Sequence, residues 1–143
     1  LFLFTKSIIS DEPINIFNNG EMIRDFTYID DISESIRRVI FKAPISNKDF
    51  NFNKINPSES WAPFKLFNIG NSNPSSLMDY VKAIEHHLEK KAIKNYLPMQ
   101  DGDVQATESD NQKLYEWINF RPNTSIEIGV GKFIKWYREF YGV

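Results

Sequence analysis

The chain has 143 residues, a length that fits one domain and is sufficient to bury an apolar core. Its formal net charge of -2 argues against a general nucleic-acid-binding protein or a membrane-surface protein, because both of those partners attract basic chains. The absence of Cys excludes disulfide bonds and thiolate metal sites, and it suits a cytoplasmic protein. Aromatic residues make up 15% of the chain, so ring packing should form much of the core.

The N-terminal stretch is an apolar pattern that begins without an initiator Met, so we expect the chain to be one part of a longer polypeptide. Residues 1–4 are apolar, but Lys6 and Asp11 follow too soon for a membrane span. The stretch also lacks the basic leader and the cleavage site of a signal peptide. Residues 2–10 are predicted to form a helix.

Two short strands and a helix are expected next. Residues 14–17 are predicted to form a strand, and Asn18-Asn19-Gly20 is a strong turn signal. A second short strand is predicted at residues 26–29. The helix after it should begin with Asp31 as N-cap and Glu34 as the reciprocal capping partner. The residues expected on its buried face are Ile32, Ile36, Val39 and Ile40.

The middle of the chain combines a long loop with a strongly patterned helix. Residues 44–63 contain several Asn, Ser and Pro residues without a period, so this loop should be either functional or mobile. A strand is predicted at residues 64–69, and Ser75 or Ser76 should cap the helix that follows. The residues expected on the buried face of that helix are Leu77, Val81, Ile84 and Leu88.

The C-terminal stretch should hold one more strand, at residues 93–97, and two helices. Ser109 with Gln112 and Thr124 with Glu127 match the pattern of capping pairs, and they mark the two helix starts. Because strands alternate with helices, the fold class is α/β with mixed layers. The strands are too few and too short for a complete doubly wound sheet. The residues expected in the core of this stretch are Trp117, Ile126, Val130, Phe133, Trp136, Tyr137 and Phe140.

Catalytic and cofactor motifs are missing from the sequence. It contains neither the glycine-rich dinucleotide fingerprint nor the phosphate loop of nucleotide triphosphatases, and no Ser or Cys nucleophile is recognisable. His86 and His87 are neighbours on a predicted helix, so they should point in different directions and be ordinary surface residues. We therefore predict no catalytic residue, no cofactor-binding residue and no metal site in this chain.

The segment from Arg24 to Ile32 carries the strongest functional signal. A guanidinium at the mouth of a strand is suited to a diphosphate, because its planar fork binds two oxygens together. The plain alternative is a surface ion pair between Arg24 and Asp25. Asp31 is a helix cap more readily than an acid or base, and Asp103 after Gly102 is equally explained by turn chemistry.

The order of these motifs resembles the C-terminal part of the NAD-dependent epimerase/dehydratase family, the extended short-chain dehydrogenases. The subgroup that the sequence resembles most is the UDP-glucuronate 4-epimerase, or capsule-type, nucleotide-sugar epimerase. The resemblance covers residues 1–143, including the loop that ends in Ala62-Pro63. The segments that carry it are Ile14 to Gly20, Arg24 to Ile32, Phe67 to Asn71, Leu97 to Val104 and Pro122 to Glu127.

The resemblance implies that the chain is the C-terminal substrate-binding domain of a two-part enzyme. The other part, a Rossmann half, carries the NAD loop and the Tyr-x-x-x-Lys catalytic pair in this family, and both are missing here. NAD would then act in the complete enzyme and would not be bound by this chain. The missing half, or a partner chain that supplies it, would be the protein partner.

Roles for individual residues also follow from the resemblance. Arg24 would bind the diphosphate of a UDP-sugar, and Asp103 would accept a hydrogen bond from a ribose hydroxyl. Residues 16–18 would lie along the uracil and contact it partly through backbone groups. Gln100 stands where galactose-specific relatives have an Arg, so this second clamp would be neutral. The residues implied to bind substrate are Ile16, Phe17, Asn18, Arg24, Gln100 and Asp103.

The implied function is the substrate-binding portion of an NAD-dependent UDP-sugar 4-epimerase, an isomerase of the UDP-glucuronate/UDP-galacturonate type. It would serve nucleotide-sugar and surface polysaccharide biosynthesis in the cytoplasm, and it would not be catalytic alone. One alternative is a stand-alone UDP-sugar-binding or oligomerisation remnant. Another is a fragment of a nucleotide-sugar dehydratase or decarboxylase. Surface that normally packs on the missing half would be exposed, so we also expect self-association.

Overall fold

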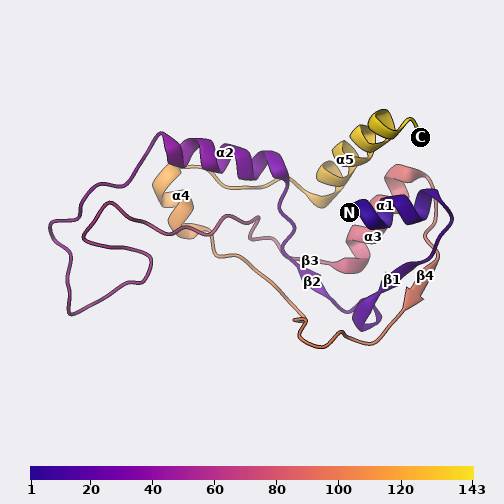
Figure 1. The fold of residues 1–143 in the computed structure, drawn as a ribbon, viewed down its shortest axis with the longest axis horizontal. Coiled ribbons are helices and arrows are strands. Elements are labelled where there is room, and N and C mark those ends of the chain that lie inside the picture. Colours follow the sequence, from indigo (N-terminus) through magenta and orange to yellow (C-terminus); the bar gives the residue numbers. More distant parts are fainter.

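The computed structural model describes all 143 residues as a small mixed α/β fold, as the sequence predicted. Three helices, α1, α3 and α5, gather around strands β1 and β4 at one end, whereas α2, α4 and a long loop form the other end (Figure 1). The elements are α1 (Phe2–Ile9), β1 (Ile14–Ile16), the 3-10 turn η1 (Phe17–Gly20), β2 (Ile23–Arg24), α2 (Ile29–Ile40), β3 (Ser75–Ser76), α3 (Leu77–Leu88), β4 (Lys94–Tyr96), α4 (Gln112–Ile118) and α5 (Ile126–Tyr141).

The strands form two small pairs. Strand β1 runs parallel to β4, with Ile14 opposite Lys94 and Ile16 opposite Tyr96. Strand β2 runs antiparallel to β3, with Ile23 opposite Ser76. Because each strand has only two or three residues, the ladders supply few hydrogen bonds, and other contacts must hold the chain segments in place.

The hydrophobic core lies where α3 packs against α5, α1 and β1. The predicted face of α3 is confirmed, since Val81 and Ile84 are fully buried and Leu88 is nearly so. On α5, Val130 and Ile134 complete the core at 2% exposure each. The full cluster of buried residues is Ile8, Ile14, Ile16, Val81, Ala83, Ile84, Leu88, Val130 and Ile134.

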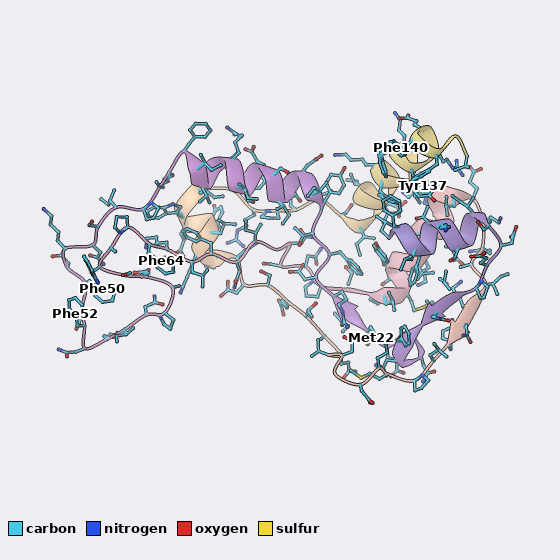
Figure 2. All side chains as sticks on the ribbon, in the orientation of Figure 1. Met22, Phe50, Phe52, Phe64, Tyr137 and Phe140 are labelled. Carbon is cyan, nitrogen blue, oxygen red and sulfur yellow. The ribbon has the colours of Figure 1, made fainter.

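The aromatic rings of α5 do not fill this core as the sequence suggested. Phe2 of α1 contacts Phe133, Trp136 and Tyr137 edge to face, with ring centroids 5.2–5.8 Å apart. Tyr137 is buried, but Trp136 and Phe140 are 43% and 68% exposed, so their expected burial is wrong. Figure 2 shows Tyr137 and Phe140 on the same helix, α5, at this end of the molecule.

The predicted caps of three helices are wrong in detail, and one cap is confirmed. Ser76 caps α3 by accepting the backbone N–H of Asp79 at 3.0 Å. Helix α5 is capped by Ser125 and not by Thr124, one residue away. Helix α4 begins after Asn111 with no side-chain cap, so the pair of Ser109 and Gln112 does not form.

Helix α2 differs most from its prediction. It begins after Tyr28, so Asp31 lies inside the first turn and is not the N-cap. The Asp31 carboxylate instead accepts the backbone N–H groups of Asn123 and Thr124, at 3.1 and 2.9 Å. It is 8% exposed, because the segment before α5 covers it. The predicted apolar face is wrong as well, since Ile36 is 47% exposed.

Glu34, the expected capping partner, forms ion pairs along the surface of α2. It accepts hydrogen bonds from Arg37 and Arg38 at 2.6–2.8 Å. The hydrogen bonds from Arg37 and then Arg38 lower the pKa of Glu34 to about 2. Glu34 is therefore paired with Arg37 and Arg38 of its own helix, and it does not act as a capping partner.

The long loop is longer than predicted. Residues 41–74 contain no helix or strand, so the strand expected at 64–69 does not form. The strand expected at 26–29 does not form either, because residues 25–28 are irregular and α2 begins at Ile29. A single bridge joins Glu59 to Lys65, and an ion pair of 3.2 Å reinforces it. Phe50 and Phe52 lie toward the tip of the molecule farthest from α5, whereas Phe64 lies nearer α4 (Figure 2). No helix of the chain has the length and apolar character needed to cross a bilayer.

Replacing Asp31 should cost stability, because two partly buried backbone donors depend on this buried carboxylate. We expect Asp31→Ala to lower the free energy of unfolding by about 2–4 kcal/mol. The matched control is the neighbouring exposed carboxylate, and Asp30→Ala should change the free energy by less than about 1 kcal/mol. Urea denaturation followed by circular dichroism measures both. Equal effects of the two substitutions would contradict the role given to Asp31.

Candidate functional site

The candidate site lies where two distant segments run side by side in the same direction. Residues 14–24 and 94–107 meet first at the β1–β4 pair and again where Ile23 bridges Ala106. Between these points, the backbone N–H of Leu97 donates to the carbonyl of Ile16 at 2.9 Å. The N–H of Ile23 donates to the carbonyl of Gln105, also at 2.9 Å. All six residues implied to bind substrate lie on these two segments.

Each segment makes a turn between the two pairing points. On the first, Asn18 and Asn19 adopt left-handed φ values of 49° and 50°, and Gly20 follows at 86°. A Cβ at Gly20 would lie 2.9 Å from the sulfur of the flexible Met78 side chain, so it is chiefly the positive φ that favours glycine there. On the second, Gly102 has a φ of 82° in a turn that the N–H of Asp103 closes.

Arg24 and Asp103 form an ion pair at the exit of these turns. Nη2 of Arg24 lies 2.8 Å from Oδ1 of Asp103, and both side chains are partly exposed, at 24% and 34%. Nη1 of the same guanidinium donates to the carbonyls of Ile23 and Gln105. The alternative pairing of Arg24 with Asp25 is therefore wrong. A part-exposed pair adds only about 0–1 kcal/mol to stability, so the pair does not explain why the segments meet.

Asp25 joins the segments that surround this ion pair, a role that sequence reasoning missed. Its carboxylate accepts the backbone N–H groups of Ser72 and Ser109, at 3.0 and 3.1 Å. The N–H of Asn73 lies 3.4 Å from the other oxygen. A single carboxylate thus joins three segments that have no regular structure. Gly70 allows this approach, since a Cβ there would lie 2.3 Å from Cβ of Ser109.

The remaining predicted residues differ in how accessible they are. Ile16 is fully buried in the core, so only its backbone could face a ligand. Phe17 is half-buried, and Asn18 donates from its side chain to the carbonyl of Glu21 at 2.8 Å. Gln100 is exposed on the polar turn.

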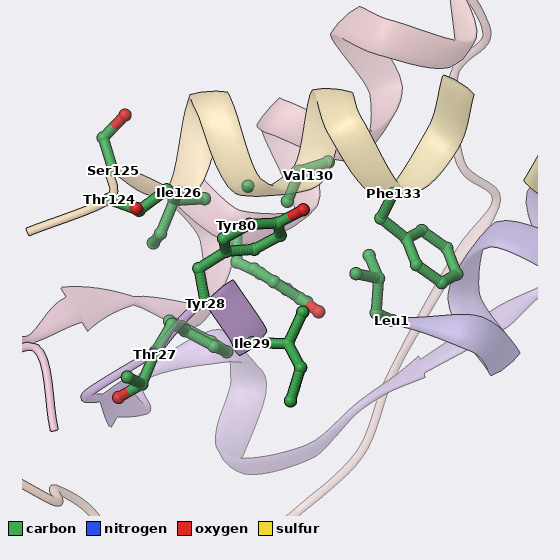
Figure 3. Close-up of a pocket in the computed structure, with 12 residues that line it drawn as sticks. Leu1, Thr27, Tyr28, Ile29, Tyr80, Thr124, Ser125, Ile126, Val130 and Phe133 are labelled. Carbon is green, nitrogen blue, oxygen red and sulfur yellow. The ribbon is translucent and has the colours of Figure 1, made fainter. Parts of the chain in front are cut away.

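A separate apolar cavity of about 270 Å³ lies between the start of α2 and helices α3 and α5 (Figure 3). Phe26 stacks on Tyr80 along it, with centroids 4.2 Å apart and planes 4° apart. Burial raises the pKa of Tyr80 to about 12, so this phenol stays protonated near neutral pH. No charged side chain lines the cavity, and neither Arg24 nor Asp103 reaches it. Sequence reasoning missed it, because its walls come from four separate segments.

Comparison with known proteins gives consistent similarities. The chain is 47% identical to protein CapI of Staphylococcus aureus over 141 residues, which cover 99% of this chain and 42% of that protein. It is 38% identical to a probable UDP-glucuronate 4-epimerase of Rhizobium meliloti over 147 residues, covering 99% of the chain and 42% of the relative. No family model matches the chain.

The fold agrees with these relatives. A solved UDP-glucuronic acid 4-epimerase from Bacillus cereus, in complex with UDP-glucuronic acid and NAD, superposes with a TM-score of 0.74. It is 24% identical, and the match covers 96% of this chain and 39% of that one. The chain is homologous to the C-terminal part of UDP-glucuronate 4-epimerase-type enzymes. It spans about two fifths of the length of the curated relatives that it matches.

The glycines of the chain do not form the glycine-rich loop that binds the diphosphate of a dinucleotide. Such a loop needs glycines that leave open space for the diphosphate to approach the backbone. Gly20 and Gly70 lie against Met78 and Ser109, while the remaining packed glycines, Gly129 and Gly131, lie under Tyr28 and His87. Gly102 and Gly142 have open space but stand alone. The glycines of this chain therefore do not form the open loop that a dinucleotide needs.

Substitution of Asp25 should loosen the site locally. In Asp25→Ala, the carboxylate oxygen that accepts the N–H groups of both Ser72 and Ser109 is removed, and no acceptor replaces it. We expect the amide hydrogens of Ser72 and Ser109 to exchange at least about tenfold faster. The amides of Asn123 and Thr124, which Asp31 holds, serve as the internal control. Unchanged protection at Ser72 and Ser109, measured by NMR hydrogen exchange, would contradict the role of Asp25.

Proposed function

We propose that this chain is the UDP-sugar-binding portion of an NAD-dependent UDP-glucuronate-type 4-epimerase, and that it is not catalytic by itself. As a domain, residues 1–143 would hold the nucleotide end of the substrate. The similarity to the Rhizobium relative, a probable UDP-glucuronate 4-epimerase, supports the sugar class. The proposed setting is the cytoplasm, where the enzyme would supply nucleotide sugars for surface polysaccharide.

The observation that carries the proposal is the meeting of Arg24 and Asp103 across two segments that are 79 residues apart in sequence. Two carbonyls hold Nη1 of Arg24, which fixes the plane of the guanidinium. Its remaining N–H donors and the charge of the group are suited to the oxygens of a diphosphate. The carboxylate of Asp103, which lies beside this guanidinium, can accept a ribose hydroxyl.

In this proposal, the ion pair is the resting arrangement of the site. A diphosphate carries more negative charge than one carboxylate, so it can compete for Nη2 of Arg24 and release Asp103 toward the ribose. The backbone of residues 16–18 would lie along the uracil, with Ile16 anchoring that edge in the core. Gln100 would add a neutral hydrogen bond near the phosphates, which is weaker than the bond an Arg would make.

The proposal divides binding from chemistry. The relative from Bacillus cereus is a complex with NAD, and in the complete enzyme NAD would supply the hydride transfer at the sugar. The glycines of this chain do not fit that cofactor, so the chain's own residues would bind, orient and retain the nucleotide. Tight binding of the nucleotide matters because the sugar must rotate in the site during epimerisation without leaving the enzyme. The complementary part, or a partner chain carrying it, would supply the catalytic groups.

A second candidate function is an oligomerisation or stand-alone binding module. The observation in its favour is the exposed apolar surface of α1 and α5, where Leu3 is 78% exposed and Phe140 is 68% exposed. Such surface tends to find a partner. This reading predicts self-association that Leu3→Glu and Phe140→Glu together abolish, as measured by sedimentation velocity. A monomer at all concentrations would contradict it. A fragment of a nucleotide-sugar dehydratase or decarboxylase is a further alternative, because the same binding surface would serve a fragment of either enzyme.

UDP binding tests the first proposal directly. Arg24→Ala should weaken binding of UDP by about tenfold to a hundredfold, because it removes charge-assisted bonds to the diphosphate. It should change the binding of uridine little, since uridine has no phosphate. The matched control is Arg37→Ala, which removes an exposed Arg of α2 that pairs with Glu34. Calorimetry that gives equal UDP affinity for Arg24→Ala and the wild type would remove Arg24 from the site.

Activity tests the division between binding and chemistry. The isolated chain should show no epimerisation of UDP-glucuronate in the presence of NAD. Addition of the complementary N-terminal part of an epimerase relative should give turnover, and Arg24→Ala should reduce it. Turnover by the isolated chain would show that its own residues do the chemistry, and the proposed division would be wrong.

A further inference from the structure

A cluster of two imidazoles and one carboxylate joins α3 to α5, on elements that the nucleotide site does not use. Nδ1 of His86 lies 2.6 Å from Oε1 of Glu127, and Nε2 of His87 lies 3.0 Å from the same oxygen. The three candidate ligand atoms all lie within 4.8 Å of one another. The two histidines therefore converge, although the sequence suggested that they point apart.

The packing of α5 on α3 explains this convergence. Neighbouring residues on one helix do not face each other, but Glu127 in the first turn of α5 reaches the last turn of α3, where both histidines lie. The ring of His87 occupies the space above Gly131, where a Cβ would lie 2.7 Å from its Cε1 atom. The absence of a side chain at Gly131 thus leaves room for the His87 ring to face Glu127.

The chemistry of the cluster suits a zinc ion. Imidazole nitrogen and carboxylate oxygen are common zinc ligands, with bonds of about 2.0–2.2 Å. Bonds of that length place tetrahedral ligand atoms roughly 3.3 Å apart. The observed 2.6 and 3.0 Å separations from Oε1 are near that spacing, whereas the cluster extends to 4.8 Å. Zinc binding thus requires the two rings to move closer together, and Nε2 of His87 must leave the backbone carbonyl of Glu127, which lies 2.9 Å away. The His86 side chain is 73% exposed, which leaves the fourth position open to water.

We propose that His86, His87 and Glu127 bind one zinc ion, which clamps the last turn of α3 to the first turn of α5. The clamp lies on the helix pair that forms the core, so its effect is on the stability of this end of the molecule. It does not depend on the proposed epimerase function, because neither Arg24 nor Asp103 takes part. An ion that binds the folded chain raises its apparent stability by mass action.

Titration of the whole chain with Zn²⁺ alone tests the proposal. Calorimetry should give one site per chain, and Zn²⁺ should raise the melting temperature. Glu127→Gln should weaken binding at least about tenfold, since loss of a direct ligand should cost no less than loss of an outer-shell partner. The matched control is Glu108→Gln, an exposed carboxylate outside the cluster, which should bind as the wild type does.

A second variant and a spectroscopic signal make the test independent of folding defects. His86→Gln changes a mostly exposed side chain, and it should also weaken binding at least about tenfold. Co²⁺ in place of zinc should give the visible absorption of a tetrahedral site in the wild type, and both variants should lose it. Absence of Zn²⁺ binding would overturn the proposal, and so would equal affinity in Glu127→Gln, because the site would then be two surface imidazoles only.

Discussion

The parallel approach of residues 14–24 and 94–107 is the constraint on which the candidate site depends. The β1–β4 ladder is only three residues long, so side-chain carboxylates hold together segments that a longer sheet would hold by backbone hydrogen bonds. Asp25 accepts backbone donors from two other segments, and Asp31 holds the segment before α5 in the same way. Each bond to a carboxylate contributes about 1.5–3 kcal/mol when the donors are otherwise buried. Two aspartates thus fix the loops that carry and surround the site.

Two neighbouring residues have different roles, since Asp25 contributes to stability and Arg24 is proposed to bind the ligand. Asp25 is engaged with the backbone and contributes little free charge to the surface. Its neighbour Arg24 forms an ion pair that is worth little in stability, but its charged end is partly exposed and its plane is fixed by two carbonyls. Such an arrangement suits a group that must be positioned in advance and still be free to change partner. The nucleotide-binding role proposed for Arg24 follows from that contrast.

The sequence predicted the elements whose cause is local. The face of α3, the cap at Ser76 and strand β1 follow from side-chain spacing and cap chemistry within a few residues, and the structure contains all three. It failed where a distant segment decides the outcome. Asp31 fits an N-cap by pattern, but the backbone of Asn123 and Thr124 claims its carboxylate. The strand expected at 64–69 finds no partner strand in the long loop and does not form.

The same contrast between local and distant causes applies to the nucleotide site and to the cluster of His86, His87 and Glu127. The family resemblance pointed to Arg24 and Asp103, whereas spacing alone could not bring together residues so far apart in sequence. The convergence of His86 and His87 on Glu127 was missed, because adjacency on one helix says nothing about a ligand from another helix.

A crystal structure of the chain with UDP would test the central claim most directly. The account predicts the guanidinium of Arg24 within hydrogen-bond distance of the diphosphate and Asp103 beside the ribose. A diphosphate bound elsewhere, with the Arg24–Asp103 ion pair intact, would contradict it.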